Sequence, residues 1–390
     1  MGPLGLPRVY WVLWVGQFVN RLGSFVLTFL PLFLTERHGY TEAEAGRVLA
    51  LYGAGNLLGA SLGGWSSDRF GRRRTLLALL AFNALVLVGF GFAPRGPLIA
   101  LAAVLHGVSN GYGPALSAAV ADVVPPDDRQ RAFGYFYWAV NLGFTVAASL
   151  GGALSRRGYH WLFLGDAASS LALVAIVYRA VPETRPAEAA AARTPLSGAL
   201  RPFADPRFTG FALAQLCALV AFVQAFVTMP LHERSQGVPV ERIGAIAALN
   251  GVVIVVAQPV FSRLARGASS GALLTASSLL LSAGALVAAR AEAAAGFAAC
   301  MAVVSLAEVV FAGAAPTFVA RVSPAALRGS YQGAYSLCWA AAGMLAPLLG
   351  PWALRRHGAH AMWTAAALVA LIATALHATL TRRAEALVRG

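Results

Sequence analysis

Long apolar runs alternate with short charged or Pro/Gly-rich segments along the whole chain. A membrane-spanning helix needs about 20 mainly apolar residues, and about twelve runs come near that length or exceed it. The runs cover residues 9–34, 44–66, 74–93, 97–122, 130–154, 159–181, 208–233, 240–265, 268–290, 293–320, 328–353 and 358–381. This pattern predicts an all-α membrane protein with about twelve transmembrane helices.

A long polar segment, residues 182–207, separates the sixth run from the seventh and is rich in Pro, Arg and Ala. It predicts a linker between an N-terminal six-helix half, residues 1–181, and a C-terminal six-helix half, residues 208–390. A weak internal repeat supports two pseudo-symmetric halves, because the pattern A-x-V-x-P-x3-R-x4-G at residues 121–134 recurs 199 residues later at 320–333. Parallel repeats of this kind are a known transporter design.

Composition excludes a soluble protein, because 58% of the residues are hydrophobic and 12% are charged, against about a quarter charged in soluble domains. The net charge of +14 comes from arginines spread over short loops, so we expect no nucleic acid as a partner. The three cysteines lack metal-ligand spacing, and no P-loop, HExxH or GxSxG context occurs. We therefore expect no metal, no cofactor and no enzymatic activity.

The loop arginines are unequally divided when successive loops are assigned to alternate sides of the membrane. One side receives 19, the other receives 10, and Arg21 lies within a predicted helix. By the positive-inside rule, both termini and the linker face the cytoplasm. We expect a multi-pass protein of the cell membrane, either inner or plasma membrane.

The loop between the second and third runs carries the most specific motif, Gly64-Trp65-Ser66-Ser67-Asp68-Arg69-Phe70-Gly71-Arg72-Arg73. It resembles the G-x3-D-R-x-G-R-R signature of the major facilitator superfamily at every fixed position. The resemblance implies a fold of two six-helix halves and a loop cluster that closes one conformation. The residues of this conformational latch are Gly64, Asp68, Arg69, Gly71, Arg72, Arg73 and, at the end of the fourth helix, Asp122.

The chain also resembles the drug:proton antiporter-like branch of that superfamily, with two departures. Residues 143–152 keep the frame of the antiporter signature G-x3-G-P-x2-G-G, but Ala147 and Ala148 replace its inner Gly-Pro. In the fourth run, Ala103 stands where many proton antiporters carry arginine. Both departures weaken the assignment to that branch and leave the superfamily assignment intact.

Ionisable side chains inside a membrane are costly and are functional candidates by default. Arg21 lies about 18 Å into the first run, at about 1.5 Å per residue, and Glu308 lies at a similar depth in the tenth. A carboxyl at that depth can exchange a proton near neutral pH, so we assign proton or cation coupling to Glu308. Asp166, six residues after His160, is expected nearer the membrane interface.

Other mid-span polar or aromatic residues are candidates for lining a substrate cavity together with Arg21. Each has the alternative role of an interhelical hydrogen bond worth about 0.6 kcal/mol, and a lone histidine is often a packing residue. The candidates are Asn20, His106, Asn110, Tyr137, Asn141, Gln224, Asn250, Tyr335 and Trp339.

These observations favour a secondary active transporter that works by alternating access and exports amphipathic small molecules in exchange for protons. One alternative is a facilitator or importer of a polar nutrient such as a sugar or carboxylate, with Arg21 as the anion contact. Another is a non-transporting membrane receptor or scaffold. The expected partners are a small-molecule substrate, protons or another coupling ion, and the lipid bilayer, and we expect a monomer.

Reporter fusions test the topology. Because the loop arginines divide 19 to 10, fusions placed after Arg193 and at the C-terminus should both report the cytoplasm. A linker reported outside the cell would exclude the twelve-helix arrangement.

Overall fold

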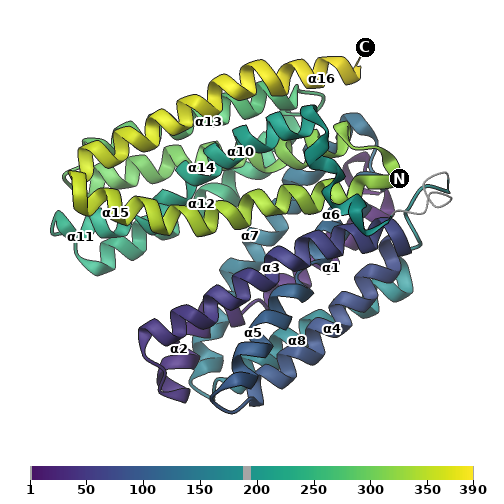
Figure 1. The fold of residues 1–390 in the computed structure, drawn as a ribbon, viewed down its shortest axis with the longest axis horizontal. Coiled ribbons are helices and arrows are strands. Elements are labelled where there is room, and N and C mark those ends of the chain that lie inside the picture. Colours follow the sequence, from purple (N-terminus) through teal and green to yellow (C-terminus); the bar gives the residue numbers. More distant parts are fainter. Residues whose placement is uncertain (1, 188–194, 390) are drawn as a thin grey trace. The chain divides into compact units, whose positions relative to one another are not determined.

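The computed structural model describes residues 2–187 and 195–389, and its regular elements in these ranges are helices (Figure 1). Apolar runs of this length form helices in a bilayer because each backbone N–H and C=O then finds a partner within its own segment. The first half of the chain holds α1 (Arg8–Leu22), α2 (Val26–Leu32), η2 (Phe33–Arg37), α3 (Glu42–Phe70), α4 (Arg72–Phe92), α5 (Pro97–Ser109), α6 (Tyr112–Val123), α7 (Arg129–Ser155) and α8 (His160–Ala180). The second half holds α10 (Pro206–Val227), α11 (Met229–Ser235), α12 (Val240–Leu264), α13 (Ser270–Ala289), α14 (Ala294–Val322), α15 (Arg328–Leu376), η6 (His377–Thr381) and α16 (Arg382–Arg389). Short 3-10 turns are η1 (Pro3–Gly5), η3 (Pro126–Asp128), η4 (Leu196–Ala204) and η5 (Ala325–Leu327).

Several predicted spans are interrupted helices. The first is broken between α1 and α2 at residues 23–25, and the fourth between α5 and α6 at Asn110 and Gly111. The last two predicted spans form the continuous α15, which is kinked at Gly358, where φ is +80°. A positive φ is easily adopted by glycine, so this residue provides the turn between the eleventh and twelfth spans.

Seven helical segments in the described residues are long and apolar enough to cross a membrane by length and composition alone. They are Arg72–Phe92, His160–Ala180, Pro206–Ser235, Glu241–Leu264, Ser270–Ala289, Ala294–Val322 and Ala325–Glu385. The last contains both final spans of the predicted twelve. The broken first and fourth spans consist of shorter helices, which explains why they fall below such a criterion.

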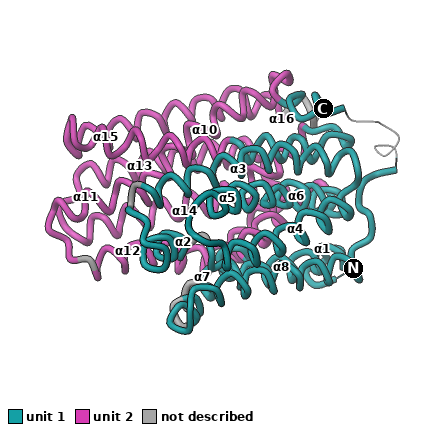
Figure 2. Tube along the Cα trace, turned by 60° about the horizontal axis from the view of Figure 1, so that its bottom comes forward, with its two compact units in different colours: residues 1–125, 139–202, 323–337 teal, residues 126–138, 203–322, 338–390 magenta. Residues whose placement is uncertain are grey.

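The helices divide into two compact units (Figure 2). Unit 1 contains residues 1–125, 139–202 and 323–337. Within it α3 packs on α5 and α6, and α8 packs on α1 and α4. Phe33, Phe90 and Phe163 meet in an aromatic core, with ring centroids 4.7–6.3 Å apart.

Glycines allow α3 to approach α5 and α6 closely. A Cβ added at Gly59 would lie 2.4 Å from the carbonyl oxygen of Val108, and one at Gly63 would lie 2.1 Å from that of Gly111. The spacing is the small-xxx-small pattern that lets membrane helices pack backbone to backbone.

Unit 2 contains residues 126–138, 203–322 and 338–390. Here α14 packs on α12 and α13, and α10 also contacts α13 and α14. Phe211 and Phe318 contact one another across α10 and α14, with their ring centroids 4.8 Å apart. Glu308 lies in the same buried helix α14.

Each unit includes one short segment from the other half of the chain. Residues 126–138, at the start of α7, belong to unit 2, and residues 323–337, at the start of α15, belong to unit 1. Each segment overlaps one copy of the A-x-V-x-P-x3-R-x4-G repeat, which covers residues 121–134 and 320–333. Each repeat copy therefore spans one of the places where the chain changes from one compact unit to the other, at 125/126 in the first copy and at 322/323 in the second.

A glycine pair tests the α3 packing. Gly59→Ala should reduce stability by about 1–3 kcal/mol, because its Cβ would overlap a backbone carbonyl that cannot move away freely. Gly53 has no atom within 4 Å of a built Cβ, so Gly53→Ala should keep or slightly raise stability. Thermal unfolding of the purified variants in detergent measures both, and equal melting temperatures would contradict the close packing.

Candidate functional site

Asp68, near the end of α3, is fully buried and is hydrogen-bonded on both carboxylate oxygens. Its Oδ1 lies 2.6 Å from Nη1 of Arg72 and 2.8 Å from the backbone N of Gly329. Its Oδ2 accepts from the backbone N and the Oγ of Ser330, both at 2.7 Å. Hydrogen bonds to a charged group are stronger than neutral ones, so Asp68 attaches the first turn of α15 to α3 within unit 1.

Arg72 joins Asp68 to a second acid. Its Nε lies 2.9 Å from Asp122, and the other oxygen of Asp122 accepts from Arg328. The Arg72 side chain is fully buried, and the carboxylates of Asp122 and Asp68 compensate its charge. Asp68, Arg72, Asp122 and Arg328 are called the loop ion cluster below.

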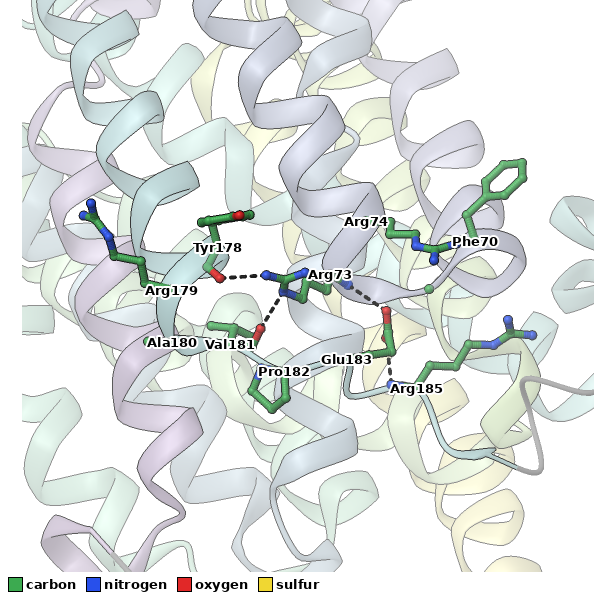
Figure 3. Close-up of a pocket in the computed structure, with 11 residues that line it drawn as sticks. Phe70, Arg73, Arg74, Tyr178, Arg179, Ala180, Val181, Pro182, Glu183 and Arg185 are labelled. Atoms are coloured by element: carbon green, nitrogen blue, oxygen red, sulfur yellow. Dashed lines mark hydrogen bonds between the residues drawn. The ribbon is translucent and has the colours of Figure 1, made fainter.

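The turn between α3 and α4 consists of Gly71, whose φ is +99°. A Cβ at Gly71 would lie 2.3 Å from the carboxylate of Glu183. That carboxylate accepts from the backbone N of Arg72 at 2.8 Å and of Arg73 at 3.3 Å, which caps the N-terminus of α4 with a negative charge. The Arg73 guanidinium donates to two carbonyls at the end of α8 (Figure 3), so the motif is also bound to the linker end of that helix.

Gly64 permits the start of α15 to approach α3 closely. A Cβ there would lie 2.3 Å from the carbonyl oxygen of Gly329, and a Cβ at Gly333 would lie 2.4 Å from that of Ala60. Arg69 is only partly buried, and its contribution is its backbone carbonyl, which accepts from Arg185 at 3.3 Å. Of the predicted latch residues, Arg69 is therefore the one whose side chain lies outside the loop ion cluster and its supporting contacts.

Glu308 of α14 is 4% exposed and is held by neutral donors within unit 2. Oε1 accepts from the Tyr137 hydroxyl of α7, and Oε2 lies 2.6 Å from Nδ2 of Asn250 on α12. Asn250 also donates to Ser305 at 3.0 Å. No ion pair within 4 Å involves Glu308 in the described part of the chain. Three residues predicted separately, Tyr137, Asn250 and Glu308, thus form one cluster.

An aromatic cluster includes a residue about one helical turn from this acid. Phe311 is three residues after Glu308 on α14, a spacing that places two side chains on one helix face. Its ring centroid lies 5.4 Å from that of Phe222 and 5.9 Å from that of Trp339. The predicted residue Trp339 therefore belongs to an aromatic cluster of unit 2.

A small polar cavity of about 40 Å³ lies inside unit 1. Its lining residues are Asn20, Arg21, Ser24, Tyr52, Asn83, His106, Asn110, Tyr112, Phe144 and Asp166. Asn20 bridges two helices here, because its Oδ1 accepts from Tyr112 at 2.9 Å and its Nδ2 donates to Ser170 at 3.3 Å. The cavity therefore brings together four predicted residues, which are Asn20, Arg21, His106 and Asn110.

The predicted residues His106 and Asn110 belong to one hydrogen-bond network. Nδ1 of His106 lies 2.9 Å from Oδ1 of Asn83, and Asn83 donates to Ser170 at 3.0 Å. Asn110 donates to the Tyr52 hydroxyl at 3.1 Å. The histidine is thus held by an amide, as expected of a packing residue with a satisfied ring nitrogen.

Arg21 and Asp166 are the two charged residues that line this cavity. The guanidinium carbon of Arg21 lies 5.3 Å from the ring centroid of Phe144, and its Nε is buried without a hydrogen-bond acceptor in the described structure. Asp166 is 8% exposed, so it is buried within the helix packing. Neither residue takes part in an ion pair within 4 Å in the described ranges.

Three predicted residues remain, which are Gln224, Tyr335 and Asn141. Gln224 is buried and donates to the carbonyl of Ala346 at 3.3 Å, a contact typical of interhelical packing. Tyr335 is partly buried in unit 1, at the start of α15, and Asn141 is partly buried in α7.

Three important partners were missed by sequence reasoning. The Glu183 carboxylate accepts from the backbone N of Arg72, and Ser330 donates to Asp68 from a distant segment. No local motif indicates either contact. Asp166 lies 14 residues before the end of α8, and Arg21 lies 13 residues after the start of α1, so both are about 20 Å from those helix ends. Counting from the linker end of α8 would have indicated their common depth.

The comparisons with known proteins agree with this architecture. The family model for the Major Facilitator Superfamily matches residues 13–291 and 237–389. An uncharacterized MFS-type transporter of Bacillus subtilis, YttB, is 23% identical over 95% of this chain and 94% of its own length. A Na⁺, Li⁺, K⁺/H⁺ antiporter of Planococcus maritimus is 25% identical over 86% of this chain and 87% of its own.

A shorter match and a solved structure complete the comparison. Multidrug resistance protein 2 of Bacillus subtilis is 30% identical over 43% of this chain and 42% of its own length. The human organic anion transporter MFSD10 (TETRAN) has the same fold, with a TM-score of 0.83 and 21% identity over 95% of this chain and 99% of its own. Because the family model matches nearly the whole sequence, the chain belongs to the Major Facilitator Superfamily.

Proposed function

We propose that this chain is a proton-coupled exporter of amphipathic small molecules, with Glu308 as its coupling residue. Its family makes it a multi-pass membrane transporter, while export, the proton and the substrate class are the proposal. The observation that carries it is the environment of Glu308, a buried carboxyl held by Tyr137 and Asn250 without a basic partner. An isolated carboxylate is costly in a membrane interior, so binding a proton would lower the free energy of keeping this residue buried.

The aromatic cluster of unit 2 supports the substrate class. Phe222, Phe311 and Trp339 form an aromatic cluster, Phe311 lies about one helical turn from Glu308 on α14, and cations bind over aromatic faces. A lipophilic cation would satisfy both features. Two relatives agree in part, since one is named for exchange of cations with protons and another for multidrug resistance.

Coupling follows if Glu308 binds either a proton or the cationic substrate. The transporter then reorients only when the Glu308 carboxylate is neutralised by one of them. A bare carboxylate would have to cross an apolar environment uncompensated, which raises the free energy of that path. Proton entry on one side then drives substrate exit on the other.

The loop ion cluster is proposed to hold the chain in one conformation. Both termini and the linker would face the cytoplasm, and the cluster would stand at that side. Asp68 is bonded to Gly329 and Ser330 at the start of α15, so α15 cannot leave α3 until these bonds break. Their strength sets how often that conformation opens.

A second candidate is transport of a polar anion through Arg21. The buried Nε of Arg21 lacks an acceptor in the described structure, and a substrate carboxylate would supply one. Uptake of a labelled carboxylate or sugar acid into cells that produce the protein separates this candidate from export.

Substitution of Glu308 tests the coupling. In inverted vesicles, a panel of lipophilic cations such as tetraphenylphosphonium is assayed with and without a pH gradient. Glu308→Gln keeps the shape and removes the titration. It should abolish uphill transport, whereas substrate–substrate exchange should persist because reorientation no longer needs a proton.

The matched control is Glu241→Gln, which removes an exposed acid in unit 2 and should pump like wild type. If Glu308→Gln still pumps uphill with an unchanged pH dependence, Glu308 is not the proton site. If no cation of the panel moves in any variant, the proposed substrate class is wrong.

Substitution of Asp68 tests the loop ion cluster. Asp68→Asn retains the side-chain size but removes the charge that binds Arg72, Gly329 and Ser330. Charge-assisted hydrogen bonds contribute about 1.5–3 kcal/mol each, so transport should fall at least about tenfold while membrane insertion is unchanged. Flux per inserted protein is compared with Asp127→Asn, an exposed loop acid, and wild-type flux in Asp68→Asn would refute the role.

A further inference from the structure

The cavity of unit 1 contains an acid that the coupling scheme above does not use. Asp166 on α8 is buried and accepts a hydrogen bond from the backbone N–H of Val26. The titratable or charged groups that line the cavity with it come from four other helices and are Arg21, Tyr52, His106 and Tyr112. Arg21 is the member of this set that keeps a full positive charge at all physiological pH values.

Arg21 and Asp166 do not form an ordinary salt bridge. Arg21 and Asp166 line the same cavity, yet no ion pair within 4 Å joins them in the described structure. The two charges therefore compensate one another across the cavity without fixed contact. Such a carboxylate is stabilised less than a directly paired one, and it can accept a proton without breaking an ion pair.

The cavity is suited to a proton rather than to a larger ligand. Its volume of about 40 Å³ is far below the roughly 300–1,000 Å³ of pockets that hold small-molecule ligands. Hydroxyl and amide groups line it, so a proton can be relayed there. A metal cation would meet the positive charge of Arg21, and His106 already has Asn83 as a ring-nitrogen partner.

We propose that Asp166 is a second proton-binding residue of this transporter, and that Arg21 is the positioning charge of the site. A proton from water bonds to one carboxylate oxygen and leaves again by the reverse step, so no other bond changes. Binding changes the net charge of the Arg21–Asp166 pair from zero to +1. Arg21 then attracts an anionic group more strongly, so proton binding at Asp166 changes the electrostatic interactions that Arg21 makes within unit 1.

The proposal rests on the proposed proton coupling only in calling Asp166 the second site, since its own protonation is measured without transport. The full chain is purified, reconstituted in nanodiscs and titrated by infrared difference spectroscopy, which follows the C=O stretch of protonated carboxyl groups. Wild type, Asp166→Asn, Glu308→Gln and the double variant are compared. Glu292→Gln, which removes an exposed acid, is the control.

Several buried carboxyl groups contribute to the wild-type spectrum, Glu233 among them, so each band is assigned by its loss in one variant. Glu308→Gln should lose one titrating band, Asp166→Asn a different one, and Glu292→Gln none. If Asp166→Asn retains every titrating band of wild type, Asp166 does not bind a proton and the inference is wrong. If Asp166→Asn loses a band and Glu308→Gln loses none, the inference stands and the assignment of Glu308 fails.

Two further variants guard against misfolding and test the role of Arg21. Asp166→Glu keeps a carboxyl and should retain a titrating band at a shifted frequency, even if Asp166→Asn does not fold. Arg21→Gln removes the positive charge that favours the carboxylate, so the midpoint of the Asp166 band should move to higher pH by about 1 unit or more. An unchanged midpoint in Arg21→Gln would overturn the positioning role.

Discussion

The organisation of this protein depends on one constraint, which is that a charge removed from water must be compensated by groups of the protein itself. Asp68 meets it with three partners, including two backbone N–H groups at the start of α15. Arg72 meets it with two carboxylates. Because these partners come from distant parts of the sequence, compensating the charges also determines which helices pack together.

The same constraint explains the exchange of segments between the two units. The start of α15 supplies donors to Asp68 in unit 1, and the start of α7 supplies Tyr137 to Glu308 in unit 2. In unit 2, Tyr135 accepts from Arg263 at 3.1 Å, and Asp128 pairs with Arg266 at 2.9 Å. The two repeat copies are therefore similar in position and different in chemistry, as expected of duplicated halves that have acquired separate roles.

Sequence predicted the helices well and the side-chain partners unevenly. Apolar run length alone located spans such as 74–93 and 159–181, which the structure forms as α4 and α8, because bilayer thickness fixes a helix length. The loop motif located Asp68 and Arg72 because their spacing is local. The partners of Ser330 and Asp166 escaped detection, because they depend on which helix faces meet and a single sequence contains no record of such contacts.

Glu308 and Asp166 show that two buried acids can differ in what a proton does to them. Neutral donors surround Glu308, so a proton there removes the only formal charge of its cluster and makes the site compatible with an apolar surrounding. Asp166 shares its cavity with Arg21, so a proton there leaves a cation behind instead of a neutral site. Neutralisation lowers the cost of moving a helix through an apolar environment, whereas an uncompensated positive charge increases attraction for an anion. The two acids are therefore not interchangeable, because the first environment favours movement and the second favours binding.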